Sequence, residues 1–346
     1  MKRLLPILLF LVTSASAQVR PVNTYSIVAR DPQTGQMGVA VQSHWFSVGP
    51  IVAWAEAGVG AIATQSFVDP SYGKLGLELL RAGKSAPEAL RALLTADDGC
   101  AVRQVGFVDA RGNVATFTGD RNIIAAGGIA ANRMGEPAKL SCGTLQVGRD
   151  FAVQANLMAS DRVWPAMAKA FSESTGDLAG KMLAALDAAQ AVGGDIRGTQ
   201  SAALVVVNAT PTGKAWVDRL FDVRVDDHAE PLAELRRLVT VQRAYNHMNA
   251  GDLAVEHNDH EAALREYGAA SRIAATTPGV PQSRQAEMIY WHAVALVSMK
   301  RVEEALPLFA RAFRLEPSWR ELTPRLVKSG LLPDDAKLIE RILAVK

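Results

Sequence analysis

The sequence predicts an α+β protein in which antiparallel sheets are covered by layers of helices, followed by an all-helical region. Of its 27 glycines, 23 lie in the first 230 residues, so a strand-rich part with many turns gives way to a helical part. In the first part, runs of short β-prone segments alternate with pairs of helices, which favours antiparallel sheets over βαβ units. The length of 346 residues corresponds to about two domains.

Residues 1–17 have the pattern of a secretory signal peptide. Lys2 and Arg3 precede an apolar run, and Ala15-Ser16-Ala17 is a small-x-small cleavage site. The apolar run is shorter than the about 20 residues that a membrane-spanning helix needs. We therefore expect a periplasmic or secreted protein without a membrane span, in which residues 18–23 form a short leader.

The charge balance argues against nucleic-acid and anionic-membrane partners. The chain has 37 basic and 35 acidic residues, and the two surplus charges, Lys2 and Arg3, belong to the predicted signal peptide. Such partners require a basic surface, which a neutral mature chain lacks.

Period-two segments and turn residues predict the elements of the first part in order. Strands are expected at 24–29, 37–42, 59–65, 102–109, 113–118, 151–156, 201–207 and 214–223. Paired helices are expected at 72–82 with 86–95, and at 162–172 with 178–191. Cys100 and Cys142 form one disulfide in an oxidising compartment or remain two buried thiols.

A polar linker, 224–231, precedes a helical domain predicted at 232–346. The 34-residue window from Ala286 to Trp319 matches the tetratricopeptide pattern of two packed helices, and a weaker copy covers 243–278. Small residues such as Ala293 and Ala305 recur where paired helices approach closely. An unrelated helical hairpin is the alternative.

Several kinds of site find no support in the first part. His44 is its only histidine, no G-x-S-x-G motif accompanies it, and the glycine-rich stretches lack nucleotide-binding spacing. No metal-ligand spacing occurs, so neither a metal nor a cofactor is expected. Thr24 remains as a nucleophile, because an N-terminal threonine carries both a hydroxyl and an α-amine whose pKa of about 8 suits a general base.

Many ordered blocks resemble the bacterial domain-of-unknown-function family 1028, which is grouped with N-terminal-nucleophile hydrolase-like folds. The blocks include Thr24 to Asp31, Gly38 to Ser43, Trp54 to Ala61, Asp69 to Gly73, Val153 to Asn156 and Gly193 to Leu204. The resemblance implies a four-layer αββα sandwich at 24–223. Relatives often carry a C-terminal tetratricopeptide-like or peptidoglycan-binding helical module, which the second part resembles.

The resemblance places Thr24 at the nucleophile position. Asn156 is then an oxyanion donor, or a strand-end amide that caps a turn, and Asp195 positions the nucleophile or pairs structurally with Arg197. The expected substrate-binding residues are Gln42, Ser43, His44, Thr64, Gln65, Arg197 and Gln200, with His44 also a proton shuttle.

Cleavage after Ala17 would leave six residues ahead of Thr24, whose nitrogen would then be a non-basic amide. A second cut at Asn23–Thr24, a mechanism without the amine, or a non-catalytic domain would each resolve this.

Two hypotheses follow. One is an exported amidohydrolase acting on an unidentified amide or cell-wall peptide. The other is an envelope scaffold that binds a peptide, a protein or peptidoglycan, with residues 232–346 contacting the partner. Self-association through the sandwich is compatible with both.

Overall fold

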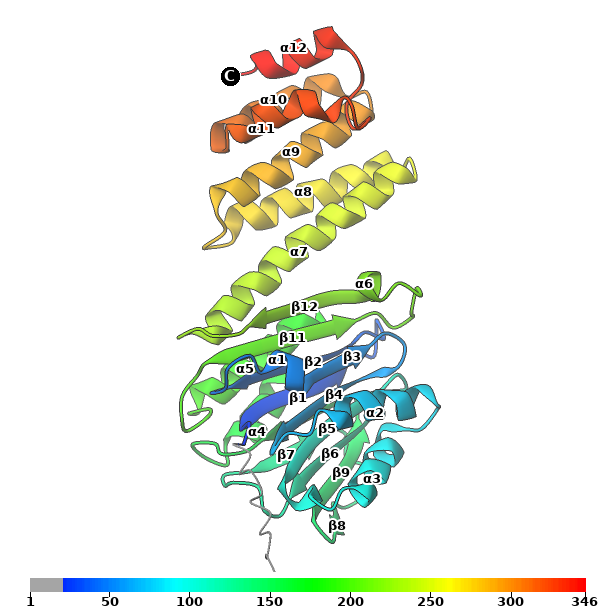
Figure 1. Ribbon diagram of the computed structural model, residues 1–346, viewed down its shortest axis with the longest axis vertical. Coiled ribbons are helices and arrows are strands. Elements are labelled where there is room, and N and C mark those ends of the chain that lie inside the picture. Colours follow the sequence, from blue (N-terminus) through cyan, green and yellow to red (C-terminus); the bar gives the residue numbers. More distant parts are fainter. Residues whose placement is uncertain (1–20) are drawn as a thin grey trace, which may run out of the picture.

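The computed structural model describes residues 21–346. The predicted signal peptide and residues 18–20 of the leader lie outside this range. The structure is mixed α+β, with two antiparallel sheets in the first part and helices in the second, as the sequence predicts (Figure 1).

Each sheet has six strands. The first sheet has the order β12-β11-β2-β1-β10-β7 and the second β3-β4-β5-β6-β9-β8. The strands of the first sheet are β1 (Thr24–Arg30), β2 (Met37–Ser43), β7 (Gly127–Ala130), β10 (Phe151–Ala155), β11 (Ser201–Val207) and β12 (Arg219–Val225). Those of the second are β3 (Ala53–Glu56), β4 (Gly60–Ser66), β5 (Arg103–Asp109), β6 (Asn113–Gly119), β8 (Ala138–Leu140) and β9 (Gly143–Arg149). Every pairing is antiparallel.

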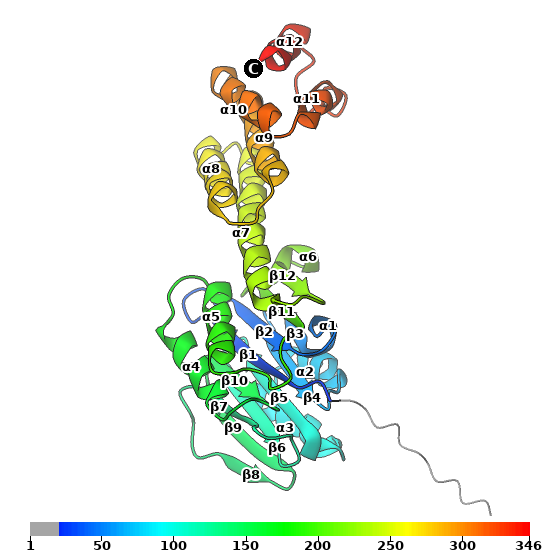
Figure 2. The ribbon, with the colours of Figure 1, turned by 90° about the vertical axis from the view of Figure 1, so that its left-hand side faces the viewer.

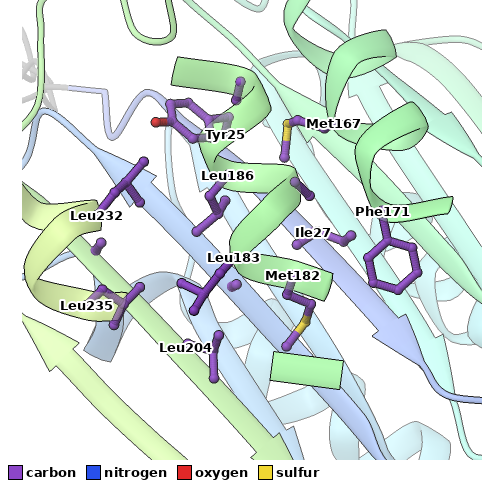
Figure 3. Close-up of a cluster of buried hydrophobic side chains, with 14 of the residues drawn as sticks. Tyr25, Ile27, Met167, Phe171, Met182, Leu183, Leu186, Leu204, Leu232 and Leu235 are labelled. Carbon is purple, nitrogen blue, oxygen red and sulfur yellow. The ribbon is translucent and has the colours of Figure 1, made fainter. Parts of the chain in front are cut away.

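Three apolar cores give the sandwich the layer order helix, sheet, sheet, helix. The helices α4 (Val163–Glu173) and α5 (Leu178–Ala191) cover the outer face of the first sheet. Figure 3 shows this core, to which Leu183 and Met182 of α5 and Ile27 of β1 belong. On the other side, α2 (Ser71–Arg81) and α3 (Ala86–Ala96) cover the second sheet. A third core, made largely of valine and alanine, lies between the two sheets.

The structure also contains elements that the sequence analysis did not identify, namely the helix α1 (Gly49–Val52) and the strands β3, β7, β8 and β9. The expected strand from Lys214 is partly wrong, because α6 (Ala215–Asp218) occupies its first half. The Asp218 carboxylate accepts hydrogen bonds from the Thr212 N–H at 2.9 and 3.1 Å, which closes a turn ahead of β12.

Cys100 and Cys142, left open by the sequence, are joined by a disulfide. Cys100 begins the short 3₁₀ helix η1 (Cys100–Val102) ahead of β5, and Cys142 immediately precedes β9. The bond therefore ties together two segments of the second sheet that are 42 residues apart in sequence.

The long helix α7 (Pro231–Glu256) belongs to both parts of the molecule. Its first turns contribute Leu232, Leu235 and Val239 to the core on the outer face of the first sheet. Its second half packs against α8 (His260–Thr276), beyond the sandwich, and the molecule is elongated along this direction (Figure 2).

The remaining helices stack beyond α8. They are α9 (Gln282–Ser298), α10 (Val302–Leu315), α11 (Ser318–Leu322), the 3₁₀ helix η2 (Thr323–Leu326) and α12 (Ala336–Ala344). The window from Ala286 to Trp319 holds α9 and α10, and Ala293, Ala305 and Phe309 are fully buried between helices as expected. In the weaker copy Tyr267 and Ala270 are buried, but Leu253 is 52% exposed.

Candidate functional site

One end of the space between the two sheets is polar, whereas the rest of that space is apolar. Twelve uncharged polar residues from this end have exposed fractions of 2% or less. They are Asn23, Thr24, Ser26, Ser43, Gln65, Ser66, Gln104, Thr116, Gln154, Asn156, Ser201 and, on the opposite face of the first sheet, Gln42. Such groups are costly to bury without partners, so their hydrogen bonds decide the local geometry.

Strand alternation explains why these side chains meet. In β1, Tyr25 and Ile27 pack under α4 and α5, so Thr24 and Ser26 face the second sheet. The register pairs Thr24 with Ser43 of β2, and Ser43 with Ser201 of β11. Thr24 therefore lies in a row of short polar side chains across the first sheet.

Buried amides connect the two sheets opposite this row. The Gln65 side chain donates to Gln104 Oε1 at 2.7 Å, and Asn156 Nδ2 donates to the same oxygen at 2.8 Å. Gln104 Nε2 donates in turn to the Ala155 carbonyl at 2.9 Å. Ser26 donates to Gln65 Oε1 at 2.6 Å. Because each amide has its orientation set by its neighbours, the network is rigid.

A glycine makes room for one member of this network. Gln154 Nε2 donates to Ser26 Oγ at 2.7 Å, and its Oε1 accepts from Thr116 at 3.3 Å. A Cβ at Gly106 would lie only 2.4 Å from Gln154 Oε1, so any other residue there would displace the amide.

Thr24 is held by its backbone rather than by its hydroxyl. Its carbonyl accepts from the Asn156 N–H at 3.1 Å and from Gln65 Nε2 at 3.2 Å. Its Oγ1 is fully buried and has no hydrogen-bond partner. A buried hydroxyl left unpaired in this way is available for chemistry at a neighbouring atom.

The neighbouring atom is the carbonyl carbon of the preceding peptide bond. The Asn23 carbonyl oxygen accepts two hydrogen bonds, from Ser43 Oγ at 2.5 Å and from Arg197 Nη2 at 2.8 Å. One hydroxyl and one guanidinium thus polarise the peptide bond that joins Asn23 to Thr24.

Asp195 fixes the guanidinium in place. Its two oxygens accept from Arg197 Nε at 3.0 Å and from Arg197 Nη2 at 2.6 Å, and Oδ1 also accepts the Arg197 N–H at 2.9 Å. The backbone N–H of His44 donates to Asp195 Oδ2 at 3.3 Å. Asp195 is buried and Arg197 is a quarter exposed, so this ion pair orients a cation at the edge of the site.

Ahead of Thr24, Val22 adds one isolated antiparallel bridge to the second sheet. Val22 exchanges backbone hydrogen bonds with Ser66, at 2.6 Å from the Val22 N–H and 2.9 Å from the Ser66 N–H. The Val22 side chain enters the apolar core between the sheets, and Asn23 is 1% exposed. Residues 22 and 23 therefore cover Thr24.

The structure brings some of the predicted site residues together and separates others. Thr24, Ser43, Gln65, Asn156, Asp195 and Arg197 meet around the Asn23–Thr24 bond. Gln42 lies on the helix-covered face of the first sheet beside Tyr25, fully buried with both amide atoms unpartnered. Thr64 faces away from the first sheet, and its hydroxyl donates to the Asp69 carbonyl at 3.2 Å.

Two more predicted residues lie outside this cluster. His44 is exposed, and only its backbone contacts Asp195. Gln200 donates to Asp227 Oδ1 at 3.1 Å, in the segment that connects β12 to α7. Asn156 donates through Nδ2 within the amide network, and the hydrogen bonds to the Asn23 carbonyl oxygen come from Ser43 and Arg197.

Sequence reasoning missed four residues of the network: Ser26, Gln104, Thr116 and Gln154. Each alternates with buried apolar residues on a strand, as Gln104 does ahead of Val105 and Phe107. A polar residue at an inward position of a buried strand is the signal that would have identified them.

Burial also affects Tyr25, on the helix-covered face. Desolvation, reinforced by the charge of Asp195, raises the pKa of Tyr25 well above its ordinary value of 10.0. Its hydroxyl donates to Gln190 Oε1 at 2.9 Å, so it remains a protonated structural donor.

Two cavities open at the edges of the sandwich. One of about 400 Å³ includes Thr116 of the network, together with Thr118, Asn122 and Trp164. The other, of about 550 Å³, lies at the opposite edge among β3, β11 and β12. Thr24 lines neither of them, in keeping with its cover by residues 22 and 23.

A third cavity, of about 610 Å³, lies among α7, α8, α9 and Leu331. Its walls combine apolar and aromatic side chains, including Met248 and Trp291, with the carboxylates of Asp252, Glu256 and Glu287. Tyr267 donates to Asp252 Oδ1 at 2.6 Å and Tyr245 to Glu287 Oε2 at 2.7 Å. Burial and the bond to Glu287 raise the pKa of Tyr245 to about 12, so its proton stays in place.

Metal-binding clusters and membrane-spanning helices are both absent from residues 21–346. Within that range, no group of His, Cys, Asp and Glu side chains is arranged to hold a metal ion. Nor does any helix in the same range have the length and apolarity to cross a membrane.

The fold and the buried site define an α+β sandwich protein with a polar cluster at one end of the space between its sheets. The chain belongs to a family of unknown function, DUF1028, whose model matches residues 24–235. It is similar to the crystal structure of protein SPO2555 from Silicibacter pomeroyi, of the same family, with 28% identity and a TM-score of 0.50. The similarity covers 62% of this chain and 87% of the other. No curated protein matches the chain.

Proposed function

We propose that this protein is an exported amidohydrolase of the N-terminal-nucleophile type, with Thr24 as the nucleophile and an amide or cell-wall peptide as the substrate. The observation that carries the proposal is the Asn23 carbonyl. It accepts hydrogen bonds from Ser43 and Arg197 directly beside the unpartnered Thr24 hydroxyl. The helix–sheet–sheet–helix order supports an N-terminal-nucleophile hydrolase-like fold.

The first reaction is a cut of the chain at Asn23–Thr24. Thr24 Oγ1 adds to the Asn23 carbonyl carbon, and Ser43 and Arg197 stabilise the charge that develops on the carbonyl oxygen. The C–N bond then breaks, the hydroxyl proton passes to the nitrogen, and an ester joins Asn23 to Thr24. Water hydrolyses the ester, releasing the leader as a carboxylic acid and leaving Thr24 with a free hydroxyl and amine.

The freed amine supplies the base that the precursor lacks. With a pKa of about 8, it accepts the hydroxyl proton as Thr24 attacks a substrate amide and returns that proton to the leaving amine. Asp195 keeps Arg197 oriented through both steps. The Cys100–Cys142 disulfide supports export, because such bonds persist in oxidising compartments.

Intact-mass measurement on the protein recovered from the periplasm tests this proposal. The wild type should begin at Thr24, whereas Thr24→Ala should retain the residues ahead of position 24. Thr64→Ala is the matched control, since Thr64 is also a buried threonine but faces away from the site. A wild type that keeps its leader, or a Thr24→Ala variant that loses it, contradicts the mechanism.

The helical part supports a second, separable activity as a peptide-binding module. Three carboxylates and no basic side chain line its 610 Å³ cavity, beside aromatic rings that can stack on a cation. We propose that it takes a lysine-type side chain of a polypeptide, in a module of the tetratricopeptide-like kind.

Fluorescence anisotropy with the full chain tests this second activity. A lysine-containing peptide should bind, and the double variant Asp252→Asn/Glu256→Gln should weaken binding by about tenfold, the worth of a charge-assisted hydrogen bond. Glu321→Gln, on the exposed surface of α11, is the control. Equal binding of a glutamate-containing peptide would contradict the proposal.

A further inference from the structure

The leader is bound as a substrate would be bound. In the precursor, Thr24 is adjacent to one acyl group, that of Asn23, whose carbonyl oxygen already lies between two hydrogen-bond donors. A second acyl group attacked by the same hydroxyl needs the same two donors at its own oxygen. It must therefore occupy the position that Asn23 leaves.

The backbone ahead of that carbonyl is also bound. Val22 forms two antiparallel backbone hydrogen bonds with Ser66 at the end of β4. Ser66 has a φ of 71°, a left-handed conformation that is uncommon for a residue other than glycine. When the leader departs, the Ser66 N–H and carbonyl lose these partners, so an extended peptide can restore the pairing by strand addition.

The side chains of Val22 and Asn23 indicate which substrate side chains fit the two positions. Val22 is 1% exposed and belongs to the apolar core between the sheets, so its removal leaves a socket for one branched apolar side chain. Asn23 is also 1% exposed, and its buried Oδ1 has no partner. That second socket holds a small, uncharged polar side chain and excludes solvent from it.

We infer that the mature protein hydrolyses extended peptide amides after a small polar residue preceded by a branched apolar one, using the sites that residues 22 and 23 of its own leader occupy. The inference rests on the proposed function of Thr24. Thr24 Oγ1 adds to the peptide carbonyl and the α-amine takes the hydroxyl proton. As the C–N bond breaks, that proton goes to the leaving amine, and water then releases the peptide acid from the ester.

Hydrolysis of acetyl-Pro-Val-Asn aminomethylcoumarin by the chain beginning at Thr24 tests the inference. We expect kcat/KM for this probe to exceed that for acetyl-Pro-Val-Lys and acetyl-Pro-Gly-Asn by about tenfold or more, the discrimination typical of one lost side-chain contact. Hydrolysis of all three at similar rates, or preference for the lysine probe, overturns the inference while leaving Thr24 as the nucleophile.

A binding measurement separates the two proposals. Calorimetry on the Thr24→Ala protein without its leader should detect the acid acetyl-Pro-Val-Asn, and N-methylation of its valine should weaken binding about tenfold by removing the bond to the Ser66 carbonyl. Binding of this peptide without hydrolysis of any probe by the Thr24 protein would refute the catalytic proposal alone. Hydrolysis of other amides without peptide binding would refute the leader-site inference alone.

Discussion

The sandwich and the helical region both place polar groups against apolar cores, but they do so in opposite ways. In the sandwich, neutral amides such as Gln65 and Gln104 are completely buried, and their partners include Ser26 and Asn156 on the side of the other sheet. In the helical region, tyrosine hydroxyls donate to carboxylates that line a cavity, as Tyr267 does to Asp252.

The difference corresponds to two roles of polar groups: the buried network fixes the position of its neighbours, whereas the cavity is suited to recognising a ligand. A fully buried amide network allows little rearrangement, because each displaced group would lose a partner in a medium that offers no replacement. Carboxylates near solvent keep their charge and can exchange water for a ligand. The first arrangement suits holding the Asn23–Thr24 bond in a fixed position, and the second suits reversible binding.

Of the variants that test this comparison, Gln104→Leu should cause the largest loss in the free energy of unfolding. It removes the acceptor of Asn156 Nδ2, the shortest of the bonds made by Gln65 Nε2, and a donor to the Ala155 carbonyl, all of them buried. We expect the free energy of unfolding to fall by about 4 kcal/mol or more in urea titration. Gln200→Leu, at a half-buried site with one side-chain bond, should cost about 1 kcal/mol or less. Equal losses for the two variants would show that the network does not stabilise the sandwich.

Removal of the disulfide should cause the second largest loss in the free energy of unfolding. Closing a 42-residue loop restricts the unfolded chain, and its loss in Cys100→Ala/Cys142→Ala should cost about 3 kcal/mol. The effect should be confined to the sandwich, so thermal unfolding followed by hydrogen exchange should show α9 and α10 unaffected. Increased exchange in those helices at the same temperature would contradict this separation.

Tyr267→Phe tests the opposite kind of polar contact. It removes only the hydroxyl that donates to the exposed Asp252, and water can replace it there. The expected loss in the free energy of unfolding is therefore about 1 kcal/mol, well below that for Gln104→Leu. A loss as large as that of Gln104→Leu would mean that the helical cavity is as rigid as the sandwich network.

The smallest expected effect is a loss of stability at acid pH, at the junction of the two regions. Asp177 caps α5 and pairs with Arg243 of α7 at 2.6 and 2.8 Å. Burial alone would raise the pKa of Asp177, but the bonds from Arg243 and from the Gly180 N–H lower it below its ordinary value of 3.8. A depressed folded-state pKa stabilises the protein above the unfolded value, and this stabilisation is lost as the pH falls below about 4.

Hydrogen exchange in the first half of α7 checks this prediction. Exchange should accelerate between pH 5 and pH 3, after correction for the intrinsic rate, and Arg243→Gln should abolish the acceleration. The pair between Arg341 and Glu303, away from the junction, is the control. Identical profiles for Arg243→Gln and the wild type would exclude Asp177 as the cause.

The sequence predicts most of the strands because their period and turn residues are local properties. It does not predict the short strand β7, whose residues Gly-Gly-Ile-Ala have little β-propensity and pair only because β10 lies beside them. It places Gln42 and Thr64 with Ser43 and Gln65, although adjacent residues of a strand face opposite ways. The contact between Arg197 and the Asn23 carbonyl spans 174 residues, and only the fold brings them together.

Because α7 belongs to both regions, nothing flexible separates them. A helix of 26 residues is about 39 Å long. Its first turns are fixed in one core and its last turns in another. A ligand held by the helical cavity would therefore be presented to the sandwich at a constant distance and direction, with no linker entropy to lose on binding. Changing the length of α7 by one residue would rotate the cavity by about 100° around the sandwich, since each residue advances the helix by that angle.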